Sequence, residues 1–195
     1  MPVRELPLFC DTALAERIER AETQLIARAS RAAHHRRPDS GGFVIPIAGG
    51  IASFADTDSP YNKVAGLGFA GVPDAKDLDG IERAFAAVDA PVQAELAHLG
   101  DPEIGPLLSD RGYRLESFEN VLGRTLDAER RLVTPPGTEV RRSGDEELET
   151  WLQVVVDASA HPDAQGLPWH DQFPRETLMA AERDSIAAGQ LRYIA

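Results

Sequence analysis

The sequence predicts an α+β (α/β) fold in which a mixed central sheet is flanked by helices. Two observations carry this prediction. A long helical repeat of apolar residues opens the chain, and short apolar runs bounded by glycine follow it. After these runs, helical and strand-like segments alternate, which is typical of a layered sheet-and-helix core. With 195 residues and 43% hydrophobic side chains, the chain can bury a sizeable core.

The elements follow from periodicity and from turn residues. Helices are expected at 12–37, 77–88, 101–112, 145–158 and 174–188, and strands at 43–48, 50–55, 64–69, 91–96, 113–126, 138–142 and 191–195. Asp11 or Thr12 suits the cap of the first helix, and its basic end, residues 34–37, suits the negative end of the helix dipole. Gly112 and Gly189 stand where helices end.

Three further features refine the predicted sheet. Pro46 places the first strand of the hairpin at an edge or a bulge, because proline donates no ladder hydrogen bond. Gly66 and Gly68 interrupt the third strand and indicate that something packs closely against it. The last strand, 191–195, stops with the chain, and a strand needs a partner. We therefore expect the sequence to be a fragment whose final strand lacks its partner, which makes a homo-oligomer conceivable.

Composition narrows the class of function. The formal net charge of −12 disfavours nucleic acid and weakly favours cationic small molecules or basic peptides. No apolar run has the roughly 20 residues needed to span a bilayer, and the N-terminus lacks the architecture of a signal peptide. We expect a cytoplasmic protein with no membrane contact. A single cysteine, Cys10, excludes an intrachain disulfide and a cysteine-based zinc site.

Two runs carry a family resemblance: Ser59–Phe69 and Leu107–Leu122. With the order of strands and helices from Phe43 to Leu126, they resemble the core of the GNAT superfamily of acyl-CoA-dependent N-acetyltransferases. The final segment resembles the beginning of a second such unit. The resemblance implies a tandem protein with a degenerate GNAT-like unit at 1–126, a linker at 127–137 and a truncated second unit at 138–195. It also implies acetyl-CoA as the cofactor and a small-molecule or peptide amine as the acceptor.

The chemistry of that family is missing from the first unit. A GNAT cofactor loop reads Gln/Arg-x-x-Gly-x-Gly/Ala, and its backbone N–H groups cradle the pyrophosphate. Here residues 70–77 follow the third strand; Pro73 removes a donor and two aspartates would repel phosphate. The run 141–146 begins like the motif but ends in Glu146. The family's general-acid tyrosine, four residues before the last helix's glycine, falls on Leu108, and Tyr113 follows that glycine, where an aromatic packs.

Five residues are candidates for substrate binding. Tyr61 and Asn62 enter the third strand and could line a pocket, although local turn bonding by Asn62 is an equally good explanation. His161, Trp169 and His170 lie in a loop that shapes the acceptor site in GNAT folds, where a histidine could act as a base or hold substrate. The alternative for both histidines is a structural or solvated loop position. Residue types in this loop also permit a metal site, but the spacing matches no specific motif.

The preferred hypothesis is therefore part of an acetyl-CoA-dependent N-acetyltransferase. Under it, the cofactor loop is expected beyond residue 195, within roughly 20–30 residues, and the chain alone is expected to be inactive. The alternative is a non-catalytic GNAT-like module for ligand binding or interaction. A third hypothesis is an unrelated α/β enzyme that uses the loop from His161 to His170. We identify no catalytic, cofactor-binding or metal-binding residue within the chain.

Overall fold

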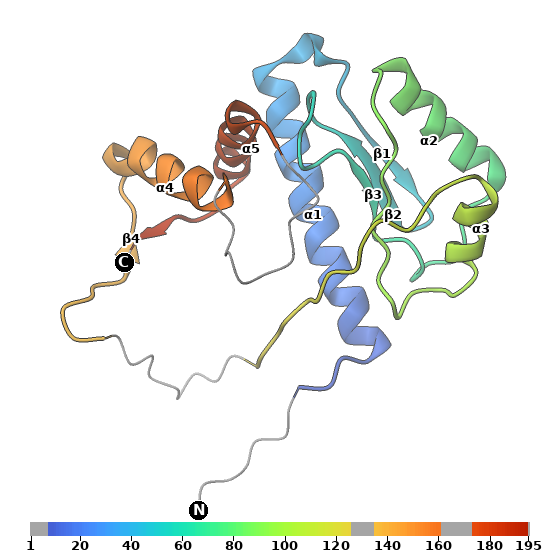
Figure 1. Ribbon diagram of the computed structural model, residues 1–195, viewed down its shortest axis with the longest axis horizontal. Helices are drawn as coiled ribbons and strands as arrows, with labels where there is room; N and C mark the ends of the chain where they lie inside the picture. Colours follow the sequence, from blue (N-terminus) through green and yellow to red (C-terminus); the bar gives the residue numbers. More distant parts are fainter. Residues whose placement is uncertain (1–7, 126–134, 161–172, 195) are drawn as a thin grey trace, which may run out of the picture.

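The computed structural model describes residues 8–125, 135–160 and 173–194, and it has the predicted α+β organisation (Figure 1). The helices are α1 (Thr12–Arg36), α2 (Ala75–Ala87), α3 (Ile104–Asp110), α4 (Leu148–Ala160) and α5 (Arg175–Ala187). The strands are β1 (Phe43–Ile47), β2 (Gly50–Phe54), β3 (Lys63–Ala65), β4 (Arg141–Arg142) and β5 (Tyr193–Ile194). The described strands form one antiparallel sheet in the order β1-β2-β3 and a separate two-stranded sheet of β4 and β5.

The hairpin of β1 and β2 forms as predicted. Its two-residue turn places Ala48 and Gly49 at φ values of 42° and 82°, the left-handed backbone that tight hairpins favour. Pro46 lies on β1, opposite Ile51 of β2. Since β1 is the outer strand of the sheet, the missing N–H of Pro46 interrupts no second ladder, which confirms the edge position.

The first sheet is covered on both faces (Figure 1). Alternation along β2 turns Ser53 toward α1, where its hydroxyl lies 2.6 Å from that of Ser30, and turns Phe54 to the opposite face. There Phe54 meets Phe85 of α2 edge-on, with ring centroids 6.4 Å apart. The core therefore lies between the sheet, α2 and α3. Its buried residues are Ile47, Ala52, Phe54, Val64, Leu67, Leu78, Ile81, Phe85, Ile104 and Leu108.

The ends of these helices follow capping chemistry. The Asp11 carboxylate accepts a hydrogen bond from Leu14 N at 2.8 Å, so Asp11 is the cap of α1. Asp74 caps α2 in the same way, which starts that helix two residues before the predicted position. Gly112 follows α3 with φ at 92°, the left-handed conformation expected of a glycine that ends a helix.

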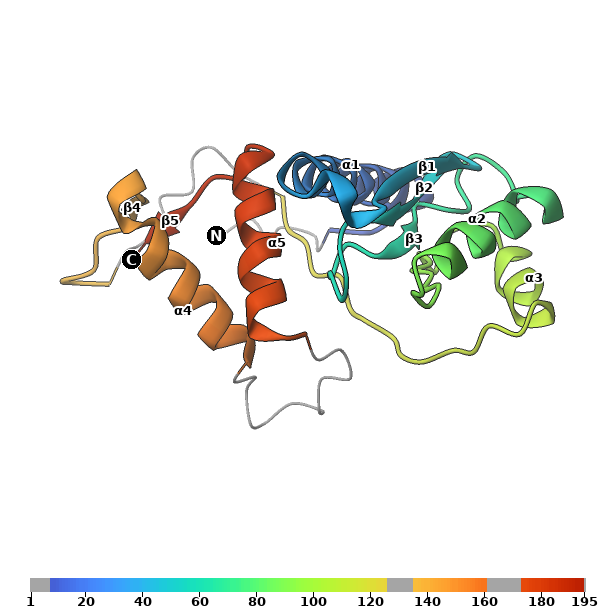
Figure 2. The same ribbon diagram turned by 90° about the horizontal axis from the view of Figure 1, so that it is seen from above.

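The second group of elements consists of α4, α5, β4 and β5. Its helices pack through a small apolar contact that buries Leu152 and Val156 of α4. The first group of elements consists of α1, α2, α3 and the β1–β3 sheet. Figure 2 shows α5 of the second group lying beside α1 of the first group. The two groups are thus in direct contact through one pair of helices.

Several predicted strands are shorter than expected. The third covers Lys63–Ala65 rather than residues 64–69, because the chain turns at Gly66 and Gly68, whose φ values are 79° and 96°. The predicted close packing at both glycines is confirmed. A Cβ atom on Gly66 would lie 2.6 Å from Thr23 Cγ2, and one on Gly68 would lie 2.7 Å from the backbone nitrogen of Asp101.

The segment 91–96 is not a full strand. It makes a single parallel bridge, in which Val64 N donates to Gln93 O at 2.8 Å and Glu95 N donates to Val64 O at 2.9 Å. The parallel direction follows from the intervening helix α2, which carries the chain back to the start of the sheet.

The predicted strand 113–126 is wrong over its described part, residues 113–125, which are extended but belong to no strand. A strand requires a partner edge, and none of the described edges pairs with it. The strands predicted at 138–142 and 191–195 shrink to β4 and β5, which pair with each other in antiparallel register. The final strand therefore has a partner within the chain, contrary to the expectation of an unpaired end.

Candidate functional site

Two of the five predicted substrate-binding residues lie at the contact between the two groups. Tyr61 and Asn62 belong to the loop between β2 and β3, which lies against α5. His161, Trp169 and His170 lie outside the described residues. The structure therefore shows the surroundings of Tyr61 and Asn62, whereas the role of the other three residues stays a prediction.

Asn62 closes its own loop. Its side-chain oxygen accepts from Ala55 N at 2.8 Å, and its side-chain nitrogen donates to Asp56 O at 2.7 Å. Both ends of the amide are thus engaged in local turn bonding, which was one of the two explanations that the sequence left open. Asn62 acts here by fixing the loop that carries Tyr61 and Asp56.

Tyr61 reaches across to the second group. Its hydroxyl hydrogen-bonds the hydroxyl of Ser185 on α5. Burial raises the pKa of Tyr61 above its ordinary value, and the nearby carboxylates of Glu182 and Asp184 add to that rise. Tyr61 is therefore a neutral hydrogen-bonding group at the contact between α5 and the β2–β3 loop.

Two arginines at the end of α1 complete the contact. The guanidinium of Arg36 donates to both oxygens of Asp184, from Nε at 2.9 Å and from a terminal nitrogen at 2.6 Å. Arg37 donates to Asp56 at 2.7 Å, and Arg36 also lies 3.7 Å from Asp56. The hydrogen bond to Asp184 is the main reason that the pKa of Arg36 rises further above its ordinary value.

These contacts give the basic end of α1 specific partners in addition to the helix dipole. The sequence favoured a general interaction of residues 34–37 with the helix dipole. In the structure Arg36 and Arg37 have specific carboxylate partners, and the ring of His34 hydrogen-bonds Phe54 O at 2.9 Å. The missed signal was the pair Asp184 and Ser185, polar residues that are buried on α5.

A pocket of about 280 Å³ opens at this contact, and we name it the junction pocket. It is lined by Arg36, Arg37, Asp56, Thr57, Ser59, Glu176, Thr177, Ala180, Ala181 and Asp184. Two arginines face three carboxylates, so the formal charge of its lining is −1. Glu176 has no ion-pair partner among the described residues, whereas both aspartates are paired. The surplus negative charge suits a small polar cation such as an ammonium group.

One buried carboxylate oxygen on α5 belongs to Glu182, outside the lining of the junction pocket. Glu182 sits three residues before Ser185 on α5 and is close enough to Tyr61 to influence its pKa. Its Oε2 atom is buried and has no hydrogen-bond partner among the described residues. Burial accordingly raises the pKa of Glu182 above its ordinary value.

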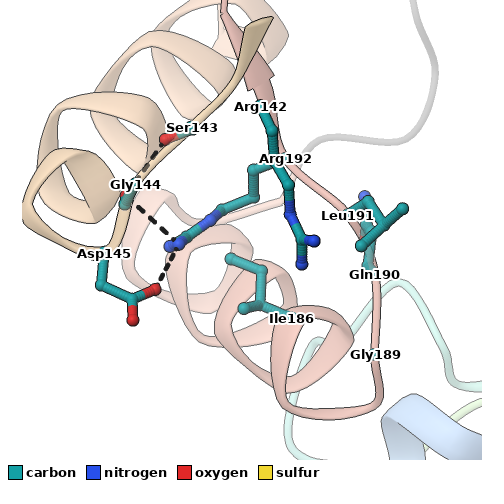
Figure 3. A pocket seen from close by; sticks show the side chains of 9 residues that line it. All are labelled: Arg142, Ser143, Gly144, Asp145, Ile186, Gly189, Gln190, Leu191 and Arg192. Carbon is teal, nitrogen blue, oxygen red and sulfur yellow. Dashed lines mark hydrogen bonds and ion pairs between the residues drawn. The ribbon is translucent and has the colours of Figure 1, made fainter.

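A second pocket, of about 390 Å³, lies in the other group between β4 and the end of α5 (Figure 3). Arg192 is largely buried there and donates to Gly144 O at 3.3 Å and to Asp145 at 2.8 Å. Figure 3 shows that the guanidinium groups of Arg142 and Arg192 diverge. Because the two guanidinium groups do not converge on one point, they do not form a single binding position for an anionic ligand. We therefore regard the junction pocket as the better candidate site.

In the motif-like run 141–146, the carboxylate of Glu147 takes the place that a bound phosphate would need. Glu147 accepts from Gly144 N at 2.8 Å and from both terminal nitrogens of Arg141, at 2.6 and 2.9 Å. These bonds lower the pKa of Glu147 to about 2, the bond to Arg141 contributing most. A phosphate would have to displace this carboxylate, which agrees with the interpretation that the run is not a cofactor loop.

Among α1–α3 and the β1–β3 sheet, the chain just after β3 packs against the segment that leads into α3. Gly68 O accepts from Asp101 N at 2.9 Å, and Leu67 is buried in the core beneath them. Leu108, at the position of the expected acid, is also buried in the core. Tyr113 packs at the edge of that core and directs its hydroxyl to Glu82 at 3.4 Å, and burial raises its pKa to about 12.

Comparison with family models, with curated proteins and with solved structures finds no match for this chain. Within the described residues, no group of three or more His, Cys, Asp or Glu side chains is arranged to hold a metal ion. None of the helices in the described part combines the length and the apolar composition needed to cross a membrane.

Proposed function

We propose that this chain is part of an acetyl-CoA-dependent N-acetyltransferase of the GNAT type, and that it contributes to holding the amine acceptor. The observation that carries the proposal is the succession of pairings in the first unit. Three antiparallel strands are followed by α2, then by the parallel bridge from Val64 to Ala94, and then by α3 and Gly112. This succession supports the element order that the sequence resemblance implied from Phe43 to Leu126 only as far as Gly112, since the last strand of that order does not form in the described residues 113–125.

Under this proposal the first unit supplies framework rather than donor chemistry. A thiolate leaving group needs a proton donor, and the buried aliphatic side chain of Leu108 has none to give. A pyrophosphate needs free backbone N–H groups, whereas in the run 70–77 Pro73 has none and Asp77 N donates to the Asp74 carboxylate at 2.8 Å. Acetyl-CoA would therefore be bound by residues other than those of the described first unit.

The junction pocket is the proposed place for the acceptor amine. Its lining carries a formal charge of −1, and Glu176 supplies an exposed carboxylate at the first turn of α5. An ammonium group could pair with Glu176 while the hydroxyl oxygens of Thr57 and Ser59 accept hydrogen bonds from its remaining N–H groups. Tyr61 does not line this pocket, and its predicted role in substrate binding stays a prediction.

Isothermal titration with spermidine and with a lysine-containing peptide tests the acceptor site. We expect binding that weakens with added salt, since the attraction is between charges. The variant Glu176→Gln should weaken binding by roughly tenfold. Glu103→Gln is the matched control, because it removes an exposed carboxylate from the start of α3, outside the junction pocket. Equal binding by both variants would remove Glu176 from the acceptor site.

Titration with acetyl-CoA and a turnover assay test the donor side. We expect the 195-residue chain neither to bind acetyl-CoA tightly nor to transfer its acetyl group to these amines. Turnover by this chain would contradict the interpretation that its first unit lacks donor chemistry.

A second candidate is a non-catalytic ligand-binding or interaction module. The run 70–77, where Pro73 has no N–H and Asp77 N is engaged by Asp74, and the buried Leu108 favour it, because neither supplies donor chemistry while the junction pocket remains in place. The two candidates differ for the natural full-length protein. Acetyl transfer by that protein would support the transferase, whereas amine binding without any transfer would support the module.

A further inference from the structure

The extended segment 113–125 exposes large apolar side chains. The exposed fractions are 75% for Leu115, 85% for Phe118, 71% for Val121 and 92% for Leu122. Soluble monomers rarely leave such a group uncovered unless a partner binds there. Figure 2 shows the segment leaving α3 and passing along the β1–β3 sheet without joining it. The feature is independent of the junction pocket and of the proposed acetyl transfer.

The residues of the segment favour a β-strand, although the segment pairs with no strand in the described structure. Strand-forming residues recur along it, and the sequence alone predicted a strand here. Its two arginines, Arg114 and Arg124, balance Glu116 and Glu119, so its formal charge is zero in a chain whose net charge is −12. Two copies of the segment can therefore approach without the repulsion that the rest of the surface would produce.

One antiparallel register makes the segment complementary to itself. When Asn120 faces Asn120 of a second copy, Glu116 lies opposite Arg124 and Phe118 lies opposite Leu122, and each pair occurs twice by symmetry. Since side chains alternate along a strand, all of these even-numbered residues share one face. The opposite face places Leu115 across from Thr125, Ser117 across from Gly123 and Glu119 across from Val121, so the complementary contacts lie on the even-numbered face.

We propose that residues 113–125 pair as a β-strand with the same segment of a second copy of this chain, in a two-fold antiparallel arrangement centred on Asn120. The partner is a second copy because Glu116 meets Arg124 and Phe118 meets Leu122 on one face in this register. Within the described structure the segment bridges neither the β1 edge nor the edge at residues 93–95. The interaction is expected to be weak, since two strands alone are marginally stable.

Cysteine cross-linking tests the register. In a Cys10→Ser background, which removes the single native cysteine, Asn120→Cys places the two thiols directly opposite each other at about 5 Å between Cβ atoms. Ser117→Cys is the matched control, because its two copies would lie roughly 20 Å apart in this register. We expect a disulfide-linked dimer under mild oxidation from Asn120→Cys and little from Ser117→Cys. Equal cross-linking of both variants, or none from either, would overturn the proposal.

A charge swap tests the partner. Sedimentation at roughly 10 µM to 1 mM should show a reversible dimer. Glu116→Arg places arginine opposite arginine twice and should weaken the dimer by about tenfold or more. Adding Arg124→Glu restores opposite charges and should restore the dimer. A monomer throughout this range, or a double variant as weak as the single one, would overturn the proposal. Far-UV circular dichroism checks that every variant keeps the fold.

Discussion

At the scale of single residues, Glu182 of α5 is an unusual group near Tyr61. Its carboxylate has a buried oxygen without a hydrogen-bond partner in the described part of the chain. An ionised group in such a place is poorly solvated, and for this reason its pKa is raised. The ionised form of such a group either lowers the stability of the fold or serves as a proton acceptor for a nearby ligand.

We expect Glu182→Gln to stabilise the protein at neutral pH by up to about 1 kcal/mol, after allowance for solvent screening. The folded-state pKa lies above the unfolded value, so the folded protein favours the protonated acid. The favourable contribution of Glu182 is therefore present below the unfolded pKa and is lost as pH rises through the folded pKa. Glutamine imitates the protonated acid, and the gain should shrink as pH falls.

Urea unfolding near pH 7.5 and near pH 4.5 measures this difference between Glu182→Gln and the parent protein. Glu103→Gln, at an exposed position, serves as the control for a general effect of net charge. A gain that is equal at both pH values would mean that the ionisation of Glu182 has no role in stability.

Sequence reasoning placed Tyr61 and Asn62 in one loop and left the role of Asn62 open. The bonds of Asn62 are local, within seven residues, so turn chemistry alone could suggest them. The partner of Tyr61 is Ser185, 124 residues further along the chain. No local pattern reports a contact over such a distance, and for the same reason the junction pocket could not be predicted.

At the scale of elements, helices were predicted better than strands. A helix is set by its own periodicity and caps, so α1, α2 and α5 begin and end within two residues of the predicted positions. A strand depends on a partner that sequence does not specify. The segment 113–125 has strand-forming residues but no paired edge in the described structure, and β3 ends early at Gly66.

The contact between α1 and α5 depends on the ion pair of Arg36 and Asp184. Asp184 is buried and receives two hydrogen bonds from the guanidinium, so its replacement leaves Arg36 without its principal partner. We expect Asp184→Asn to lower the free energy of unfolding by roughly 2 kcal/mol and to loosen α5 from α1. Hydrogen exchange of the α5 amides would report the loosening directly.

Glu149→Gln provides the matched control for this change. Glu149 of α4 pairs with Arg183 of α5 at 2.7 Å, but both side chains are exposed. Exposed pairs contribute little, so the control should alter stability by less than about 0.5 kcal/mol. If Asp184→Asn had as small an effect as Glu149→Gln, then apolar packing rather than the ion pair would hold the two helices together.

At the scale of the whole molecule, the apolar core belongs to the first group of elements. Every member of the main core cluster lies between Ile47 and Leu108. In residues 135–194, the described apolar side chains that are buried are Leu152, Val156 and Ala181. So small a core is insufficient for independent stability at this length. The second group should therefore depend on α1 for its fold.

We expect a peptide of residues 135–195 to show weak helical signal and no cooperative thermal transition in far-UV circular dichroism. Alone, it leaves Asp184 and Ser185 without Arg36 and Tyr61. The complementary fragment 1–134 retains the sheet, α2 and α3, and should unfold cooperatively. Mixing the fragments should restore helical signal, and Asp184→Asn in the peptide should prevent that restoration. A cooperative transition of the peptide by itself would show that the second group is an independent domain, and that its contact with α1 only joins two units that are already folded.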